Sequence, residues 1–144
     1  MTAPMTVPRN GLSTDPWTTV FPSADLVDDR GVCALVGARH VAVFRLSVSG
    51  ELVAIDNVDP FSGASVLSRG LVGSTEIGGI AVAYVASPLR KQRFDLRTGC
   101  CLDDPDVRVD RFDVRETAGQ IEARPVHEGN GAGSSWGNVE EIGA

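Results

Sequence analysis

The chain contains few of the residues that bind metals or form disulfides. Its 144 residues include three Cys and two His. Cys100 and Cys101 are adjacent, so together with Cys33 they form neither a C-x-x-C pair nor an even-numbered disulfide framework. His40 and His127 are far apart and show no metal-ligand spacing. These shortages argue against a disulfide scaffold and a zinc motif, and they favour a reducing compartment.

Long apolar runs and an excess of positive charge are also missing. No apolar run approaches the ~20 residues that span a bilayer, and the first residues lack the charged and apolar regions of a signal peptide. The formal net charge is −6, whereas general nucleic-acid binding needs clustered Lys and Arg to neutralise phosphates. We therefore expect a cytoplasmic protein that binds neither nucleic acid nor a membrane.

The composition is that of a single globular domain. The chain is 42% hydrophobic and 22% charged, which is ordinary for a folded domain of this size. Residues 1–15 contain Pro and few large apolar side chains, and we expect a flexible leader there. Residues 126–144 are rich in Gly, Ser, Asn and Glu, and we expect a flexible tail that only Trp136 could anchor. The domain is expected over residues 16–125.

Short apolar and β-branched segments separated by turn residues predict an all-β fold. Strands are expected at residues 17–21, 31–36, 41–46, 52–55, 80–86, 93–96, 111–116 and 120–124. Ser23 is expected to cap a helical turn at 23–26. The continuous apolar run at 80–86 predicts a central strand buried on both faces. The Gly and Ser residues of 62–74 predict a connection.

Two segments resemble the iron–sulfur loops of a Rieske domain: N-V-D-P-F at 57–61, and S-P-L-R-K-Q-R-F-D-L-R-T-G at 87–99. In that family a C-x-H loop and a C-P-x-H-G loop supply two Cys and two His to the cluster, and an F-D-x-x-T-G strand and turn follow. Lys91 stands at the position of the loop Gly. The family pattern is retained at Pro88, Phe94, Asp95, Thr98 and Gly99.

The four positions that would carry cluster ligands hold Asp59, Phe61, Ser87 and Arg90. Phe has no donor atom, Arg stays protonated, and Ser is a poor ligand for a soft iron–sulfur centre. We therefore predict that this chain binds no metal and no cofactor. A purely structural role is an equal alternative, in which Asp59 and Arg90 form an ion pair or a hydrogen-bonded bridge that fills the former cluster site.

Longer strings narrow the resemblance. Residues 56–73 read D-N-V-D-P-F-S-G-A-S-V-L-S-R-G-L-V-G, and residues 85–105 read V-A-S-P-L-R-K-Q-R-F-D-L-R-T-G-C-C-L-D-D-P. Both strings are similar to the small subunit of NAD(P)H-dependent nitrite reductase, and the similarity covers residues 17–124. It implies a Rieske-like antiparallel β sandwich or barrel, with two ligand-type loops at one end and no iron–sulfur cluster. It also implies an accessory, non-catalytic subunit in nitrite assimilation. The expected partner is a large catalytic subunit carrying FAD, a [4Fe–4S] cluster and sirohaem.

A basic run at residues 90–93 is unusual in a chain this acidic. It is either a solvated charged loop or part of a docking surface for the large subunit. We favour docking, because interfaces commonly combine an apolar centre with Arg at its edge. The candidate docking residues are Phe61, Arg69, Leu89, Lys91 and Arg93.

Other functions stay open at this stage. The chain could be an autonomous Rieske-type electron carrier, which the missing ligands disfavour, or a cluster-free interaction or regulatory module with a different redox partner. Independent catalysis is disfavoured, because no Ser-His-Asp or Cys-His arrangement can be argued from the spacing. Cys100 and Cys101 are interpreted as ordinary thiols. The resemblance leaves the coenzyme open between NADH and NADPH.

Overall fold

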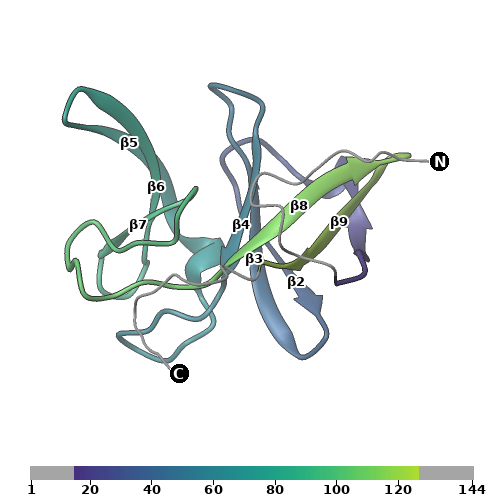
Figure 1. Cartoon of the computed structure of the whole chain (residues 1–144), viewed down its shortest axis with the longest axis horizontal. Helices are drawn as coiled ribbons and strands as arrows, with labels where there is room; N and C mark the ends of the chain where they lie inside the picture. Colours follow the sequence, from purple (N-terminus) through teal and green to yellow (C-terminus); the bar gives the residue numbers. More distant parts are fainter. Residues whose placement is uncertain (1–14, 127–144) are drawn as a thin grey trace. The chain divides into compact units, whose positions relative to one another are not determined.

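The computed structural model describes residues 15–126, and residues 17–124 form one compact unit (Figure 1). Strands dominate this unit, as the sequence predicts. The leader and tail, including Trp136 and His127, lie outside the described residues except at their inner ends. The elements are β1 (Thr18–Pro22), η1 (Ser23–Asp25), β2 (Val32–Val36), β3 (Arg39–Arg45), β4 (Leu52–Asp56), η2 (Leu67–Arg69), β5 (Leu71–Ile77), β6 (Ile80–Ala86), β7 (Arg93–Asp95), β8 (Arg111–Thr117) and β9 (Gln120–Pro125), where η marks a 3-10 helix.

The strands form two antiparallel sheets. The larger has six strands in the order β1-β9-β8-β4-β3-β2, and the smaller has three in the order β5-β6-β7 (Figure 1). Strand β1 also approaches β2, so the larger sheet curls toward a closed barrel. The main core lies between the sheets, where Phe44 and Ile55 of the larger sheet pack with Val85 and Phe94 of the smaller one.

Most strand predictions are confirmed within a residue or two of their ends, because alternating burial and turn residues mark them. The β8–β9 hairpin is an example. Ala118 and Gly119 form its turn with positive φ angles of 52° and 79°, the left-handed geometry of the tightest hairpin turns. Within residues 15–126, no helix is long and apolar enough to cross a membrane.

Three local predictions are wrong. Strand β6 has the predicted ends, but Val85 is its only buried residue, because the smaller sheet leaves one face outside the core. Strand β5 begins at Leu71, inside the segment predicted as a connection, and continues to Ile77, since pairing with β6 compensates for its small residues. The helical turn forms at Ser23, but its N-cap is Pro22 and no side chain caps it.

Candidate functional site

A buried hydrogen bond joins the two Rieske-type loops. The first loop follows β4 and the second follows β6, and Asp59 and Ser87 of these loops are each 0% exposed. The Ser87 hydroxyl donates to Asp59 Oδ2 at 2.6 Å, while Asp59 Oδ1 accepts the backbone N–H of Phe61 at 2.8 Å. These are the two positions at which the Rieske pattern has Cys. The loops are therefore joined by a direct acid–hydroxyl contact, and such short hydrogen bonds to a carboxylate are strong when water is excluded.

The second loop keeps the tight turn of the family pattern. The backbone carbonyl of Ser87 accepts the N–H of Lys91, and the N–H of Ser87 donates to the carbonyl of Gln92, both at 2.9 Å. Lys91 has a φ of 68°, which lies in the left-handed region that favours Gly. A lysine thus adopts the backbone conformation expected of the glycine that the family pattern has at this position.

Asn57 anchors the first loop, a role that its sequence position did not predict. Its side chain is 1% exposed, donates to Ser65 Oγ at 2.8 Å and accepts the backbone N–H of Ser68 at 2.6 Å. Its backbone carbonyl accepts the N–H groups of Val66 and Leu67. The loop is thereby tied to η2. An Asn directly after an apolar strand is a common turn residue, and this was the only sequence signal for its role.

The other two ligand positions do not converge on Asp59. Phe61 is half-buried against the main core, with its ring centroid 6.2 Å from that of Phe94 and tilted by 48°. Arg90 is exposed. The alternative with an Asp59–Arg90 bridge is wrong, because the Asp59 oxygens bind Ser87 and the Phe61 N–H, and no ion pair links it to Arg90 in the described chain.

The candidate docking residues differ in how firmly they are held. Leu89 is 56% exposed, and Arg69 and Lys91 are also exposed. Arg93 is held by Asp103, with a guanidinium–carboxylate distance of 2.8 Å, and lies over the Tyr84 ring at 5.5 Å from its centroid. Hydrogen bonds from Arg93 lower the pKa of Asp103. The sequence indicated neither partner, since Tyr84 reaches Arg93 through the pairing of β6 with β7 and Asp103 through the segment that folds back on β7.

The donor set does not fit a [2Fe–2S] cluster. At the four ligand positions, Asp59 and Ser87 are hydrogen-bonded to each other. Phe61 is an aromatic side chain packed on the core, and Arg90 is an exposed guanidinium. Residues 15–126 contain no group of three or more His, Cys, Asp or Glu that could hold a metal. The thiols of Cys33 and Cys101 are not activated, because burial raises the pKa of both.

Comparison with known proteins identifies the family. Residues 16–124 match the family model described as a Rieske-like [2Fe-2S] domain. The NADH nitrite reductase small subunit of Salmonella typhimurium is 42% identical over 108 residues, which are 75% of this chain and 96% of that protein. The chain belongs to the nitrite reductase small-subunit family. A crystal structure assigned to the family member of Mycobacterium tuberculosis superposes with a TM-score of 0.68 at 46% identity, covering 78% of this chain and 97% of that one.

A segment similar to this chain also occurs inside a longer polypeptide. The NAD(P)H nitrite reductase large subunit of Klebsiella oxytoca is 36% identical to this chain over 110 residues, which are 76% of this chain and 11% of that protein. This chain is therefore similar both to free small subunits and to a segment of a large subunit.

Proposed function

We propose that this chain is the accessory small subunit of a cytoplasmic NAD(P)H-dependent nitrite reductase, which reduces nitrite to ammonium in nitrate and nitrite assimilation. In this proposal the chain carries no cluster and no catalytic residue. FAD, a [4Fe–4S] cluster and sirohaem belong to the large subunit. The observation that carries the proposal is the Asp59–Ser87 hydrogen bond at the positions of the cluster cysteines, in a chain of the small-subunit family.

The large subunit as partner is supported by the Klebsiella oxytoca protein. There a domain similar to this chain is part of the large-subunit polypeptide. A domain that is a separate chain in one organism and a segment of the catalytic polypeptide in another is expected to act in contact with it. This chain would supply that contact as a separate subunit.

Docking would use the ends of the two loops. Leu89 provides an exposed apolar side chain and Phe61 a half-buried one. Arg69 and Lys91 add exposed positive charge, and neither forms an ion pair within residues 15–126. Arg93 would contribute indirectly as well, because its contacts with Asp103 and Tyr84 hold the strand that follows the loop.

The activity test measures nitrite-dependent NAD(P)H oxidation by the large subunit with and without this chain. We expect the chain to raise the rate, the cofactor content or the stability of the large subunit. The purified chain alone should show no visible iron–sulfur absorption and no reductase activity. Iron–sulfur absorption bands in the purified chain would contradict the cluster-free proposal. Binding of a different redox protein to the chain, and not of the large subunit, would support the interaction-module alternative.

The docking test compares two substitutions at one position. Lys91→Glu reverses the charge, whereas Lys91→Gly removes it and keeps the left-handed backbone. We expect Lys91→Glu to bind the large subunit more weakly than Lys91→Gly. Arg93 is unsuitable for this comparison, because reversing its charge would also break the contact with Asp103. If both variants bind the large subunit as tightly as the parent chain does, Lys91 is not part of the docking surface.

A further inference from the structure

Strand β5 has a free edge. It pairs with β6 along its whole length of seven residues, from Leu71 opposite Ala86 to Ile77 opposite Ile80. No other strand in the described part of the chain lies on its second side. Leu71 is 78% exposed and Ile77 is 50% exposed. An edge of this kind is a template for an additional strand.

The hairpin geometry identifies which backbone groups face outward. A turn at Gly78–Gly79 makes Ile77 and Ile80 the pair that exchanges hydrogen bonds, and such pairs alternate along an antiparallel ladder. The N–H and C=O groups of Val72, Ser74 and Glu76 therefore point away from β6. These three residues offer a regular row of donors and acceptors to a partner strand.

The other sheet edges are protected, whereas β5 is not. Strand β1 has an irregular register between Thr19 and Phe21 and ends in Pro22. The edge of β2 is approached by β1, and β7 is extended by a backbone hydrogen bond from Leu102 to Arg93. Strand β5 contains no Pro and no Lys, and its register is continuous. Natural edge strands usually carry one of these protective features.

A hollow opens beside the first residues of β5. Its volume is about 600 Å³, and its lining includes Val27, Arg30, Arg69, Leu71 and Val72. Arg30 and Arg69 form no ion pair with any residue between 15 and 126. Val27 is 55% exposed at the same hollow. Apolar side chains and unpaired guanidinium groups thus lie together where an added strand would begin or end.

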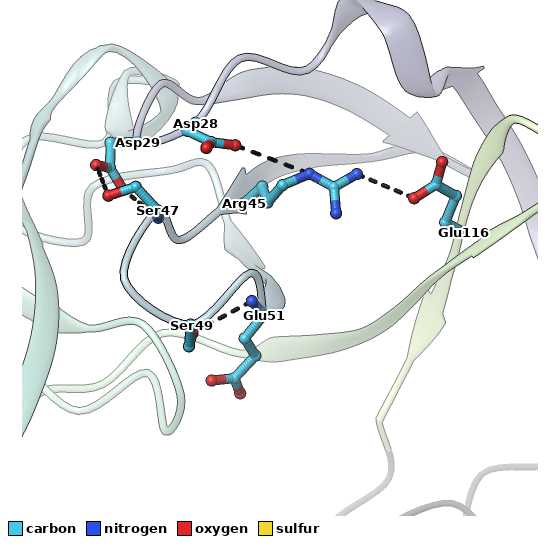
Figure 2. Close-up of polar contacts among 7 residues, drawn as sticks. All are labelled: Asp28, Asp29, Arg45, Ser47, Ser49, Glu51 and Glu116. Atoms are coloured by element: carbon cyan, nitrogen blue, oxygen red, sulfur yellow. Dashed lines mark hydrogen bonds and ion pairs between the residues drawn. The ribbon is translucent and has the colours of Figure 1, made fainter.

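The acids of the hollow do not neutralise these arginines. Asp25 and Asp29 also line it, but Figure 2 shows the Asp29 carboxylate directed at Ser47, whose backbone N–H and hydroxyl both donate to it. Asp25 forms no ion pair with Arg30 or Arg69. A carboxylate on an incoming segment would therefore meet two available cations.

We propose that an extended segment of the large subunit adds to β5 as a fourth strand of the smaller sheet, with an apolar side chain and a carboxylate of that segment entering the hollow. This inference rests on the proposed function and extends its docking surface from Arg69 along β5. Backbone pairing would supply affinity, and the hollow would supply specificity. The net charge of −6 on each copy opposes a second copy of this chain as the occupant.

Amide hydrogen exchange tests strand addition directly. In the isotope-labelled full-length chain, we expect the outward N–H groups of Val72, Ser74 and Glu76 to exchange rapidly when it is free. We expect them to exchange at least about tenfold more slowly in the complex with the large subunit. The inward N–H groups of Gly73 and Thr75 serve as controls, because they pair with β6 in both states.

Variants of β5 supply a second readout. Ser74→Pro removes one outward N–H but keeps the contacts with β6, and Leu71→Lys places a charge at the hollow. Leu35→Lys is the matched control, since Leu35 is 59% exposed on β2. We expect both β5 variants to bind the large subunit at least about tenfold more weakly, and the control to bind like the parent chain.

The outcomes separate this inference from the proposed function. If the parent chain binds no large subunit, the proposed function fails and the inference fails with it. If it binds, but the outward amides stay unprotected and both β5 variants bind normally, strand addition is overturned and the accessory function stands. If exchange of the same amides is also slowed in the free chain, and more so as the chain is concentrated, two copies pair through β5. That result also overturns the inference.

Discussion

At the scale of single residues, the candidate site shows how a ligand position can become a structural one. Two Cys in a Rieske loop pair bind one iron and so connect the loops through the metal. Here Asp59 and Ser87 connect the same loops directly, through one hydrogen bond of 2.6 Å. Both residues are fully buried. Either partner left alone would be a buried polar group without its hydrogen bond, which is costly.

The Asp59–Ser87 contact predicts a coupled loss of stability. We expect Asp59→Ala to lower the free energy of unfolding by about 3 kcal/mol and Ser87→Ala by about 1–2 kcal/mol, because each leaves buried groups unpaired. The double variant should lose at least about 1 kcal/mol less than the sum of the two, as expected for residues in direct contact. Urea unfolding at neutral pH measures all three.

The control for the Asp59 and Ser87 variants is Asp106→Ala, at an exposed loop position. It should change the free energy of unfolding by less than about 0.5 kcal/mol. Strict additivity of the Asp59 and Ser87 variants would show that the hydrogen bond does not stabilise the fold.

Asp29 predicts an acid-sensitive contribution to stability. Hydrogen bonds from Ser47 lower the pKa of Asp29 below its ordinary value of 3.8. The unfolded chain therefore binds this proton more readily than the folded one. The contribution is complete above the unfolded pKa and is lost as the pH falls through the folded pKa. Between pH 5 and pH 2, we expect the urea midpoint of Asp29→Asn to fall less than that of the parent chain.

Asn is the appropriate replacement at this position, because the φ of Asp29 is 62° and Asn tolerates the left-handed region. Asp106→Asn is the control and should keep the acid dependence of the parent chain. An unchanged acid dependence in Asp29→Asn would show that the Ser47 contact does not respond to pH.

At the scale of elements, the turns and connections determine whether the strands can pair. Gly99 has a φ of 82°, and a Cβ there would lie 2.2 Å from the carbonyl oxygen of Val109. Val109 also donates its backbone N–H to the carbonyl oxygen of Gly99. The Thr98–Gly99 turn of the family pattern therefore has two reasons for Gly, backbone conformation and close approach. The turn brings the segment after β7 back against that strand.

Two glycine substitutions separate these reasons. Gly37 also has a positive φ, of 60°, but nothing lies within 4 Å of its Cβ position. We expect Gly37→Ala to cost about 1–2 kcal/mol, from the left-handed conformation alone. Gly99→Ala should cost more than about 3 kcal/mol, since the Val109 backbone must also move. Thermal or urea unfolding of the two variants measures the difference, and equal losses would mean that the Val109 backbone moves freely.

At the scale of the whole molecule, the charge distribution is uneven. The chain carries a net charge of −6, yet Arg69, Arg90 and Lys91 are exposed near the loops and have no ion-pair partner in residues 15–126. Several arginines elsewhere are paired, such as Arg39 with Asp56 and Arg97 with Glu51. Unpaired positive charge on an acidic protein favours an acidic partner surface and affects mainly the rate of association.

Association with the large subunit should therefore depend on salt. We expect the association rate constant to fall about tenfold or more between 0.05 M and 0.5 M salt, because screening shortens the reach of these charges. The dissociation rate constant should change less. An Arg90→Gln, Lys91→Gln double variant should show a smaller dependence, measured by stopped-flow mixing or surface-based kinetics. An association rate that is independent of salt would exclude a role for the loop charges in docking.

The sequence by itself determined the all-β class, the Rieske-type loop pair and the small-subunit family, because these depend on short-range patterns and on ordered motifs. It could not determine which side chains meet. Only the tertiary structure showed that Asp59 binds Ser87 and not Arg90, that Asp103 and Tyr84 hold Arg93, and that Asn57 anchors the first loop. It also revealed β5 and its free edge, because the small residues of this segment do not show a strand pattern in the sequence. The hydrogen-bonded partners of Arg93, Asn57 and Asp59 are 10, 11 and 28 positions away from them, and only strand pairing and the course of the loops bring them within bonding distance.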